Sequence, residues 1–216
     1  MRIVAFVTQK GGSGKSTLAS SIAVAAAEAG ERVVLIDMDP QASLVKWAKM
    51  RGKHDIAVEA VAPAKLKSVL SAIAGKGVTL VVLDTPAGET PATEAATRAA
   101  DLTIIPSRPN AFDLWSSEAT RKSVKATRRD YVFLLNQCPP AQQTARIEEG
   151  LSALESLGGI LTPAIAARVD YQEAVRHGLG PTEYAPSSAA ADDIRKLWRS
   201  LRKRLSRGAQ PQRKAA

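Results

Sequence analysis

A glycine-rich segment near the start of the chain carries its clearest chemistry. Residues 10–17 read Lys-Gly-Gly-Ser-Gly-Lys-Ser-Thr, directly after the apolar run 3–8 and before a helical pattern. Glycines let the backbone curl so that successive N–H groups point at phosphate oxygens, and a helix N-terminus adds a partial positive charge. Such a context favours phosphate binding over an empty glycine-rich turn. We therefore predict a nucleotide-phosphate loop made of Gly11, Gly12, Ser13, Gly14, Lys15, Ser16 and Thr17.

Two further segments place carboxylates near this loop. Residues 36–41 read Ile-Asp-Met-Asp-Pro-Gln and residues 80–88 read Leu-Val-Val-Leu-Asp-Thr-Pro-Ala-Gly. In an extended chain Asp37 and Asp39 point to the same side, at the edge where open α/β sheets bind ligands. An acid at the end of an apolar strand, such as Asp84, is how phosphate-loop enzymes hold Mg²⁺. Acids at a strand end also cap the next helix, which is the alternative for Asp37 and Asp39.

The positioning of these residues requires strands that alternate with helices. Short apolar, β-branched runs alternate with longer alanine- or leucine-rich patterns, and the runs are apolar throughout. This pattern predicts an α/β protein with a doubly wound, mostly parallel sheet and helices on both faces. The predicted strands are 3–8, 32–37, 78–84, 102–106 and 131–136, with weaker candidates at 56–61 and 159–165. The predicted helices are 15–29, 42–49, 64–74, 90–99, 114–127, 144–157, 171–177 and about 187–205.

Composition excludes several classes of protein. Of the 216 residues, 45% are hydrophobic and 24% are charged, which is typical of a globular domain and not of a disordered or fibrous chain. The single cysteine, Cys138, excludes a disulfide framework and a metal site built from several thiolates. No run approaches the roughly 18 apolar residues that span a bilayer, and the run 3–7 is too short for a secretory signal. We therefore expect a cytoplasmic protein that begins at Met1.

Positive charge is concentrated in two places. The formal net charge is +9, and residues 195–214 hold nine basic residues and no acidic one. A second basic cluster consists of Arg121, Lys122, Lys125, Arg128 and Arg129. Clustered cations are typical of a nucleic-acid binder, and we favour DNA or another polyanion over a merely solvated helix face.

The glycine-rich segment resembles the deviant Walker A motif of the ParA/MinD group of P-loop ATPases. The common phosphate-loop pattern has a glycine where this chain has Gln9, and Lys10 follows. In that family the extra lysine reaches the partner's phosphates across a nucleotide-sandwich dimer. The resemblance therefore implies that Lys10 supplies a charge in trans that stabilises the transferred phosphoryl group. It covers nearly the whole chain and implies one P-loop ATPase domain over residues 1–206. The low-complexity composition of residues 207–216 predicts a basic, disordered tail.

The same resemblance assigns roles around the loop. It implies ATP and Mg²⁺ as ligands, with the metal near Ser16, Asp37 and Asp84. Lys10, Lys15 and Asp39 are the implied catalytic residues, and Asp39 positions or polarises the attacking water. Residues 84–88 resemble the second switch of the family, in which the Gly88 amide senses a γ-phosphate.

Two later segments extend the resemblance. Residues 105–115 resemble the P-x-x-P…D segment that lies near the family's dimer face. Asn136 occupies the place where the family puts an asparagine on the adenine, although Gln137 replaces the usual basic residue. An asparagine at a strand end is also an ordinary turn former, so both interpretations of Asn136 stay open.

The resemblance is to the small ParA type of plasmid or chromosome partition systems, a close cousin of which positions protein cargos such as carboxysomes. Because only eight residues precede Gln9, we expect no N-terminal helix-turn-helix domain. The family's ATP-bound homodimer binds DNA without sequence preference, and a ParB-like or cargo-adaptor protein stimulates hydrolysis. A cytoplasmic, nucleoid-associated protein is implied. Metabolic relatives are disfavoured by the absence of substrate-binding insertions, and iron–sulfur relatives by the single cysteine.

The last predicted helix is amphipathic. Ile194, Leu197, Trp198, Leu201 and Leu205 form a regular apolar stripe. The predicted DNA-binding residues occupy the rest of its surface and are Arg195, Lys196, Arg199, Arg202, Lys203 and Arg204. A MinD-like helix that binds anionic lipid is the alternative. We favour DNA, because a stripe this regular more often completes a core.

Overall fold

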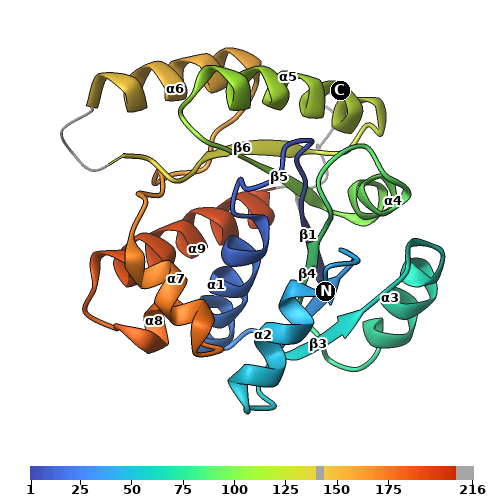
Figure 1. Ribbon diagram of the computed structural model, residues 1–216. Coiled ribbons are helices and arrows are strands. Elements are labelled where there is room, and N and C mark those ends of the chain that lie inside the picture. Colours follow the sequence, from blue (N-terminus) through green and yellow to red (C-terminus); the bar gives the residue numbers. More distant parts are fainter. Residues whose placement is uncertain (140–143, 208–216) are drawn as a thin grey trace, which may run out of the picture.

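One parallel sheet organises the molecule. The computed structural model describes residues 1–139 and 144–207 (Figure 1). Its strands pair in the order β3-β2-β4-β1-β5-β6, and each pairing is parallel. The strands are β1 (Arg2–Phe6), β2 (Val33–Asp37), β3 (Ala57–Ala60), β4 (Leu80–Asp84), β5 (Leu102–Ser107) and β6 (Tyr131–Leu135). The predicted doubly wound α/β sheet is therefore confirmed.

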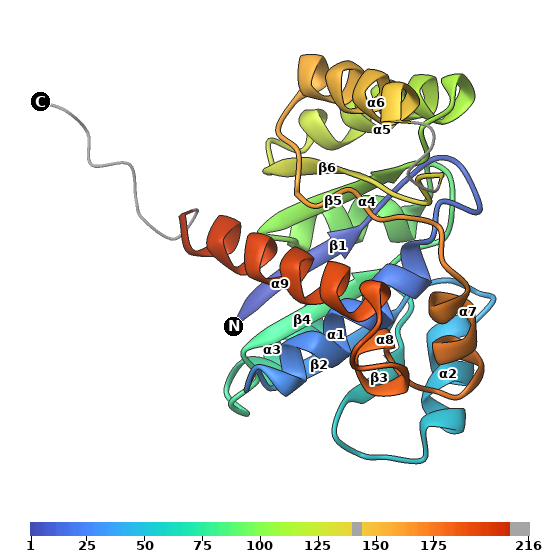
Figure 2. The ribbon, with the colours of Figure 1, turned by 90° about the vertical axis from the view of Figure 1, so that its left-hand side faces the viewer.

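Helices cover both faces of this sheet. They are α1 (Lys15–Glu28), α2 (Ser43–Arg51), the 3-10 turn η1 (Pro63–Lys65), α3 (Leu66–Ala74), α4 (Pro91–Ala99), α5 (Ala111–Ala126), α6 (Thr144–Leu157), α7 (Val169–Arg176), α8 (Pro181–Tyr184) and α9 (Ala189–Arg207). Figures 1 and 2 show α1, α2 and α7–α9 on one face and α3–α6 on the other. Alternate strand residues feed the two cores, as when Val4 and Phe6 join one cluster and Ala5 and Val7 the other. Apolar side chains are needed on both sides of the strands, which explains their unbroken apolar sequences.

Helix α9 lies across the sheet beside α1 (Figure 2). Its apolar stripe is buried in the core, with Ile194 and Leu201 fully inaccessible and Trp198 only 4% exposed. The interpretation that this stripe completes a core is therefore confirmed. Among the helices of the described ranges, none is both long and apolar enough to cross a membrane.

Three details of the sequence prediction need correction. The weak strand at 159–165 was wrong, because this segment only bridges at Ile160 and, one residue beyond it, at Ala166. Pro163 lies between the two bridges and has no N–H for a continuous ladder. The turn α8 was missed because four residues are too few to show helical periodicity. Helix α5 begins before residue 114, since the side chain of Asn110 accepts a hydrogen bond from the N–H of Asp113 and caps it.

The boundary of the predicted tail also moves. Helix α9 continues to Arg207, and residues 208–216 of the predicted tail lie outside the described residues.

Candidate functional site

The phosphate loop connects β1 to α1 at the carboxyl edge of the sheet. Gly12 and Gly14 adopt positive φ angles of 74° and 88°, which glycine tolerates best. A Cβ on Gly14 would stand 2.5 Å from Nδ2 of Asn136, so a larger residue would clash there. Helix α1 begins directly after this glycine without a side-chain cap, and its first N–H groups have no acceptor within the helix. The loop thus presents several N–H donors to an anion.

Unpaired buried oxygens mark the inside of this cradle. Among the described residues, Oγ of Ser13 and Oδ1 of Asp84 are buried and have no hydrogen-bond partner. The other oxygen of Asp84 accepts a hydrogen bond from Oγ of Ser16 at 2.5 Å. Burial raises the pKa of Asp84 to about 7, and the hydrogen bond from Ser16 opposes this shift. A hydroxyl and a carboxylate with a free oxygen are hard ligands that suit Mg²⁺.

The protein side chains alone do not complete a metal site. The described residues contain no group of three or more His, Cys, Asp or Glu side chains arranged to hold a metal. Mg²⁺ in nucleotide sites is commonly held by one or two protein oxygens together with phosphates and waters. Ser16 and Asp84 fit that smaller requirement, and the structure brings these two predicted residues together.

Asp37 has a different environment in this structure. It lies beside Asp84 across the β2–β4 pairing, but its oxygens accept backbone hydrogen bonds. Oδ2 accepts from the N–H of Leu44 at 2.9 Å and of Val45 at 3.3 Å, and Oδ1 accepts from the N–H of Asp39 at 3.1 Å. Asp37 therefore caps α2, as the alternative interpretation of the sequence had it. Its place near a metal stays a prediction.

Lys15 and Asp39 complete the inner part of the site. Lys15 is buried, and burial lowers its pKa, while the charges of Asp84 and Asp39 act in the opposite direction. Asp39 is half-buried, and its Oδ1 accepts a hydrogen bond from the N–H of Gln41. The amide of Gly88, the predicted phosphate sensor, donates to the carbonyl of Thr8. The ammonium of Lys15 is thus buried near the carboxylates of Asp84 and Asp39.

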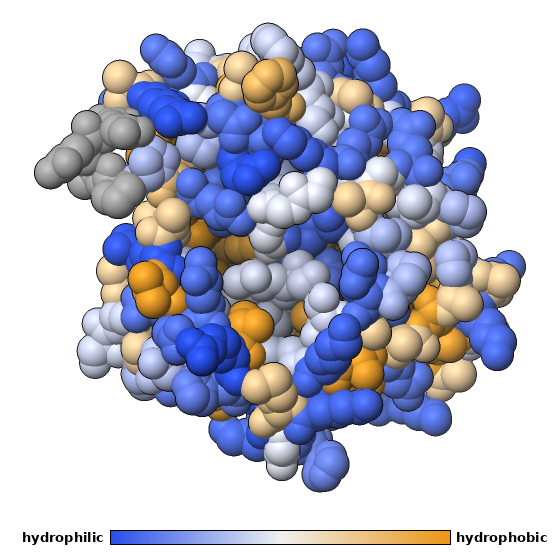
Figure 3. Space-filling model, in the orientation of Figure 1, coloured by the Kyte–Doolittle hydropathy of each residue, from blue (hydrophilic) through white to orange (hydrophobic). Residues whose placement is uncertain are grey.

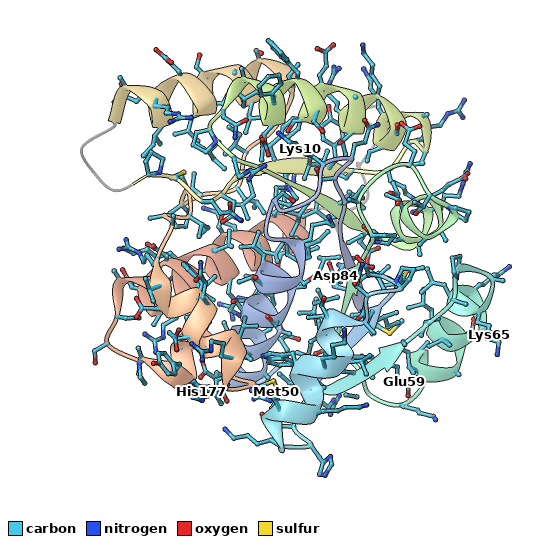
Figure 4. All side chains as sticks on the ribbon, viewed as in Figure 1. Lys10, Met50, Glu59, Lys65, Asp84 and His177 are labelled. Carbon is cyan, nitrogen blue, oxygen red and sulfur yellow. The ribbon has the colours of Figure 1, made fainter. Side chains whose placement is uncertain are left out.

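Lys10 is directed away from these groups. Its Nζ donates to Oδ2 of Asp113 at 2.7 Å and lies 5.5 Å from the centre of the Phe112 ring. Arg108 binds the same carboxylate through both oxygens, at 2.9 and 3.2 Å. Burial would raise the pKa of Asp113, but the hydrogen bonds from Arg108, Lys10 and Asn110 outweigh it and hold that pKa below its usual range. In Figure 4, Lys10 lies beside α5 and away from Asp84.

Two aromatic residues border this ion pair on the surface. Phe112 and Trp115 are 70% and 67% exposed, and their rings pack edge to face at 5.5 Å. Sequence analysis placed residues 105–115 near the dimer face of the family but singled out neither the aromatic pair nor the contact between Asp113 and Lys10. The sequence feature that could have pointed to this contact is the aspartate of the P-x-x-P…D pattern, which is Asp113.

A hollow of about 400 Å³ opens on the other side of the loop. Its walls include Gly14, Thr17, Asn136, Gln137 and the segment 165–169. Nδ2 of Asn136 donates to the carbonyl of Ser13 at 2.7 Å, and Nε2 of Gln137 donates to that of Gly12 at 3.0 Å. Asn136 thus joins the loop and lines this hollow, and its contact with adenine stays a prediction. Figure 3 shows the face hollowed near its centre, between α5 and α6 above and α2 and α7 below.

The six predicted DNA-binding residues of α9 differ in their partners. Lys196 pairs with Asp192, Arg204 pairs with Asp130, and Arg195 donates to the carbonyl of Pro186. In the part of the chain that the structure describes, the other three cations form no ion pair and are exposed: Arg199, Arg202 and Lys203. These three are the most available for an external polyanion.

Comparison with known proteins agrees with this geometry. Residues 4–204 match the family model of the CobQ/CobB/MinD/ParA nucleotide binding domain. The chain is 32% identical over 212 residues to maintenance of carboxysome distribution protein A of Gloeobacter kilaueensis, which covers 93% of this chain and 94% of that protein. It is 26% identical over 245 residues to the chromosome-partitioning ATPase Soj of Thermus thermophilus, with coverages of 91% and 94%.

Solved structures show the same fold. MinD of Pyrococcus horikoshii in complex with Mg-ADP aligns with a TM-score of 0.77 at 20% identity, covering 97% of this chain and 99% of that one. Apo McdA of Cyanothece aligns with a TM-score of 0.79 at 16% identity, covering 95% and 99%.

Proposed function

Because the chain belongs to the ParA/MinD family of nucleotide-binding proteins, we propose that it is an ATPase that partitions DNA or positions a protein cargo. It binds Mg-ATP, forms a homodimer, attaches to DNA without sequence preference, and is released when a ParB-like or cargo-adaptor protein stimulates hydrolysis. The relatives named above for partition and carboxysome distribution support this assignment. The observation that carries it is the inner corner of the site, where Lys15, Ser16 and Asp84 lie together.

The inner corner binds the nucleotide. Loop N–H groups and the ammonium of Lys15 bind the β- and γ-phosphates. Ser16 and Asp84 offer oxygens to Mg²⁺ once the hydrogen bond between them opens. The ion, when bound, neutralises charge that develops on the transferred phosphoryl group. Asp39 is half-buried beside Lys15 and orients the water that attacks the γ-phosphate.

Lys10 acts in the partner's site. To reach another subunit, its ammonium leaves Asp113, which remains bound to Arg108. A cation delivered in trans stabilises the transition state in the manner of an arginine finger. Hydrolysis then depends on dimerisation, because a single chain keeps this charge on α5.

The aromatic pair beside Lys10 supports the same dimer face. Exposed aromatic rings are enriched in the cores of protein interfaces, where burial of their apolar area favours association. Phe112 and Trp115 are exposed and adjoin the lysine that must cross to the partner. We assign this patch to the homodimer.

Helix α9 supplies the cations for DNA. Contacts from lysine and arginine to phosphates give affinity without base readout. Arg199 and Lys203 are exposed on the side of α9 opposite its buried stripe, and the exposed Arg202 flanks the stripe. The MinD-like alternative requires the apolar stripe to enter a lipid surface, which would remove it from the core. Burial of the stripe favours DNA.

A combined assay tests the proposal. Phosphate release from Mg-ATP is measured with the wild-type chain, with and without sheared DNA of unrelated sequence, and DNA binding is measured with ATP, with ADP and without nucleotide. We expect slow turnover and DNA binding only with ATP. Failure to bind any nucleotide would overturn the ATPase assignment. Pelleting with anionic liposomes but not with DNA would favour the membrane alternative.

A variant sharpens this test. Asp39→Ala is expected to bind ATP and remain dimeric on DNA without hydrolysing it, because the water is no longer oriented. Wild-type turnover in this variant would show that another residue positions the water. The matched control is Glu118→Ala, which removes an exposed carboxylate on α5 that pairs with Lys122.

A further inference from the structure

A group of arginines lies at the end of the sheet opposite the phosphate loop. Arg2 begins β1, and Arg128 and Arg129 lie in the turn between α5 and β6. A hollow of about 230 Å³ is lined by Arg2, Asp101, Leu102, Arg128, Arg129, Asp130, Arg204 and Leu205. The nucleotide site occupies the carboxyl ends of the strands, whereas this hollow lies at their amino ends.

The carboxylates of the hollow are already engaged. Both oxygens of Asp130 accept from Nη2 of Arg204, at 2.9 and 2.8 Å, and Oδ1 also accepts from the N–H of Tyr131. Oδ2 of Asp101 accepts from the N–H of Ile3 at 2.8 Å.

The arginines outnumber the carboxylates of the hollow. Within residues 1–139 and 144–207, Arg2, Arg128 and Arg129 form no ion pair. Arg128 and Arg129 are exposed and Arg2 is half-buried. The hollow therefore holds four guanidinium groups against the two carboxylates of Asp101 and Asp130, which leaves a local excess of two positive charges.

The backbone at Arg128 gives an independent indication. Its φ is 57°, in the left-handed region, directly after the C-terminal cap of α5. Glycine is the usual residue at such a position, because a Cβ is disfavoured there. Residues held in a disfavoured backbone conformation are often found at functional sites.

These observations point to a ligand with phosphate groups. A guanidinium group offers a planar fork of donors that matches two phosphate oxygens. Arg2 also lines a neighbouring hollow together with Arg202, so the group is continuous with the exposed cations of α9. We propose that Arg2, Arg128 and Arg129 form a second phosphate-backbone site for duplex DNA, continuous with the end of α9. The inference rests on the proposed DNA binding and extends its surface around the edge of the sheet.

Three charge-matched variants test the site. The edge variant is Arg2→Gln, Arg128→Gln and Arg129→Gln. The helix variant is Arg199→Gln, Arg202→Gln and Lys203→Gln. The control variant is Lys46→Gln, Lys49→Gln and Lys76→Gln, three exposed lysines that line neither hollow of this arginine group. Binding to a fluorescent duplex of unrelated sequence is measured with ATP across a salt series, and ATP turnover and melting temperature are measured in parallel.

Loss of phosphate contacts has a defined signature. Each lost contact reduces the slope of log affinity against log salt by about 0.9, so the edge variant is expected to lose roughly two to three units of slope. Its affinity near physiological salt is expected to fall at least about tenfold, while the control stays within about twofold of wild type. Equal binding by the edge and control variants would overturn the second site while DNA binding through α9 stands.

Two further outcomes would each overturn the proposal for a different reason. If the wild type turns over ATP but binds no duplex in any nucleotide state, DNA binding as a whole fails and the site with it. If vesicles of anionic lipid are bound instead, and the edge variant loses that binding, the ligand is a membrane and the DNA inference is overturned.

A single substitution separates binding from folding. Arg128→Gly relieves the positive φ and is expected to keep or raise the melting temperature. It is also expected to weaken duplex binding and reduce the salt slope by about one contact. Unchanged duplex binding by this stable variant would exclude Arg128 from the site.

Discussion

The two lysines of the phosphate loop are held in opposite ways. Lys15 is buried at the start of α1, near the carboxylates of Asp84 and Asp39. Lys10 is 35% exposed in its side chain and is bound to Asp113, on an element that does not belong to the loop. The inner lysine is ready for a nucleotide in the isolated chain, and the outer lysine is not placed to act on one.

The difference separates binding from catalysis. Preorganised groups lose little free energy when a ligand arrives, so the inner corner is suited to bind ATP in a single chain. The ammonium of Lys10 must leave its ion pair with Asp113 before it can act. It does so only when a second surface offers a stronger interaction than Asp113. Under the proposed function, this arrangement links turnover to association.

Removal of the inner lysine is expected to have the broadest effect, because dimerisation and hydrolysis both require bound nucleotide. Lys15→Ala should abolish nucleotide binding, with a loss of affinity of at least about a hundredfold, because a preorganised cation aimed at phosphate is removed. Titration with a fluorescent ATP analogue measures this. The melting temperature is measured in parallel, because loss of this ammonium leaves the carboxylates of Asp84 and Asp39 without its positive charge. Binding within a few-fold of wild type would show that Lys15 does not contact phosphate.

Removal of the outer lysine is expected to spare binding and reduce turnover. Lys10→Ala should bind the same analogue normally, fail to dimerise stably, and lose up to about a thousandfold in partner-stimulated hydrolysis, as expected for a charge supplied in trans. Mixing Lys10→Ala with Asp39→Ala chains provides a control. If Lys10 acts across the dimer, mixed dimers recover turnover at the one site that has both groups. No recovery would place Lys10 in its own site.

The inner corner was easier to predict from the sequence than the outer corner, where Lys10 contacts Asp113. Ser16, Lys15 and Asp84 follow strands whose apolar runs are unmistakable, and parallel strands bring their carboxyl ends to one edge. The sheet and the burial of the apolar stripe of α9 followed from the same periodicity. The capping of α2 by Asp37 was present as an alternative, but the choice depends on the loop at Ala42, whose φ of 51° leaves the helix without a cap of its own.

The outer corner depends on tertiary contacts that no local pattern encodes. Lys10 and Asp113 are 103 positions apart, and their contact requires α5 to begin beside the phosphate loop. The arginine edge also joins distant segments, since Arg2 begins β1 and Arg128 lies in the turn between α5 and β6. Sequence analysis noted the basic cluster that contains Arg128, but only the topology of the sheet places Arg2 beside it.

Release of Lys10 from Asp113 should change the dimer dissociation constant, by less than the two lysine substitutions change binding and turnover. Asp113→Asn removes the charge that holds Lys10 and is expected to lower the ATP-dependent dimer dissociation constant about fivefold, the equivalent of a partly exposed ion pair worth about 1 kcal/mol. Sedimentation velocity measures it. Glu94→Gln, which breaks the exposed pair with Arg98 on α4, is the control. Weaker dimerisation in Asp113→Asn would mean that Asp113 itself contributes to the dimer face.

The smallest expected effect is spectroscopic and follows the outer corner directly. Of the three tryptophans, Trp47 and Trp198 are 3% and 4% exposed, whereas Trp115 is 67% exposed beside Lys10. Closure of a dimer over this patch should bury Trp115 and shift tryptophan emission to shorter wavelength, while a change confined to the inner corner should not. Wild type with ATP should show the shift, and Lys15→Ala and Trp115→Phe should not. A shift in wild type that is retained in Trp115→Phe would place the conformational change at a buried tryptophan, and the aromatic pair would then lie outside the interface.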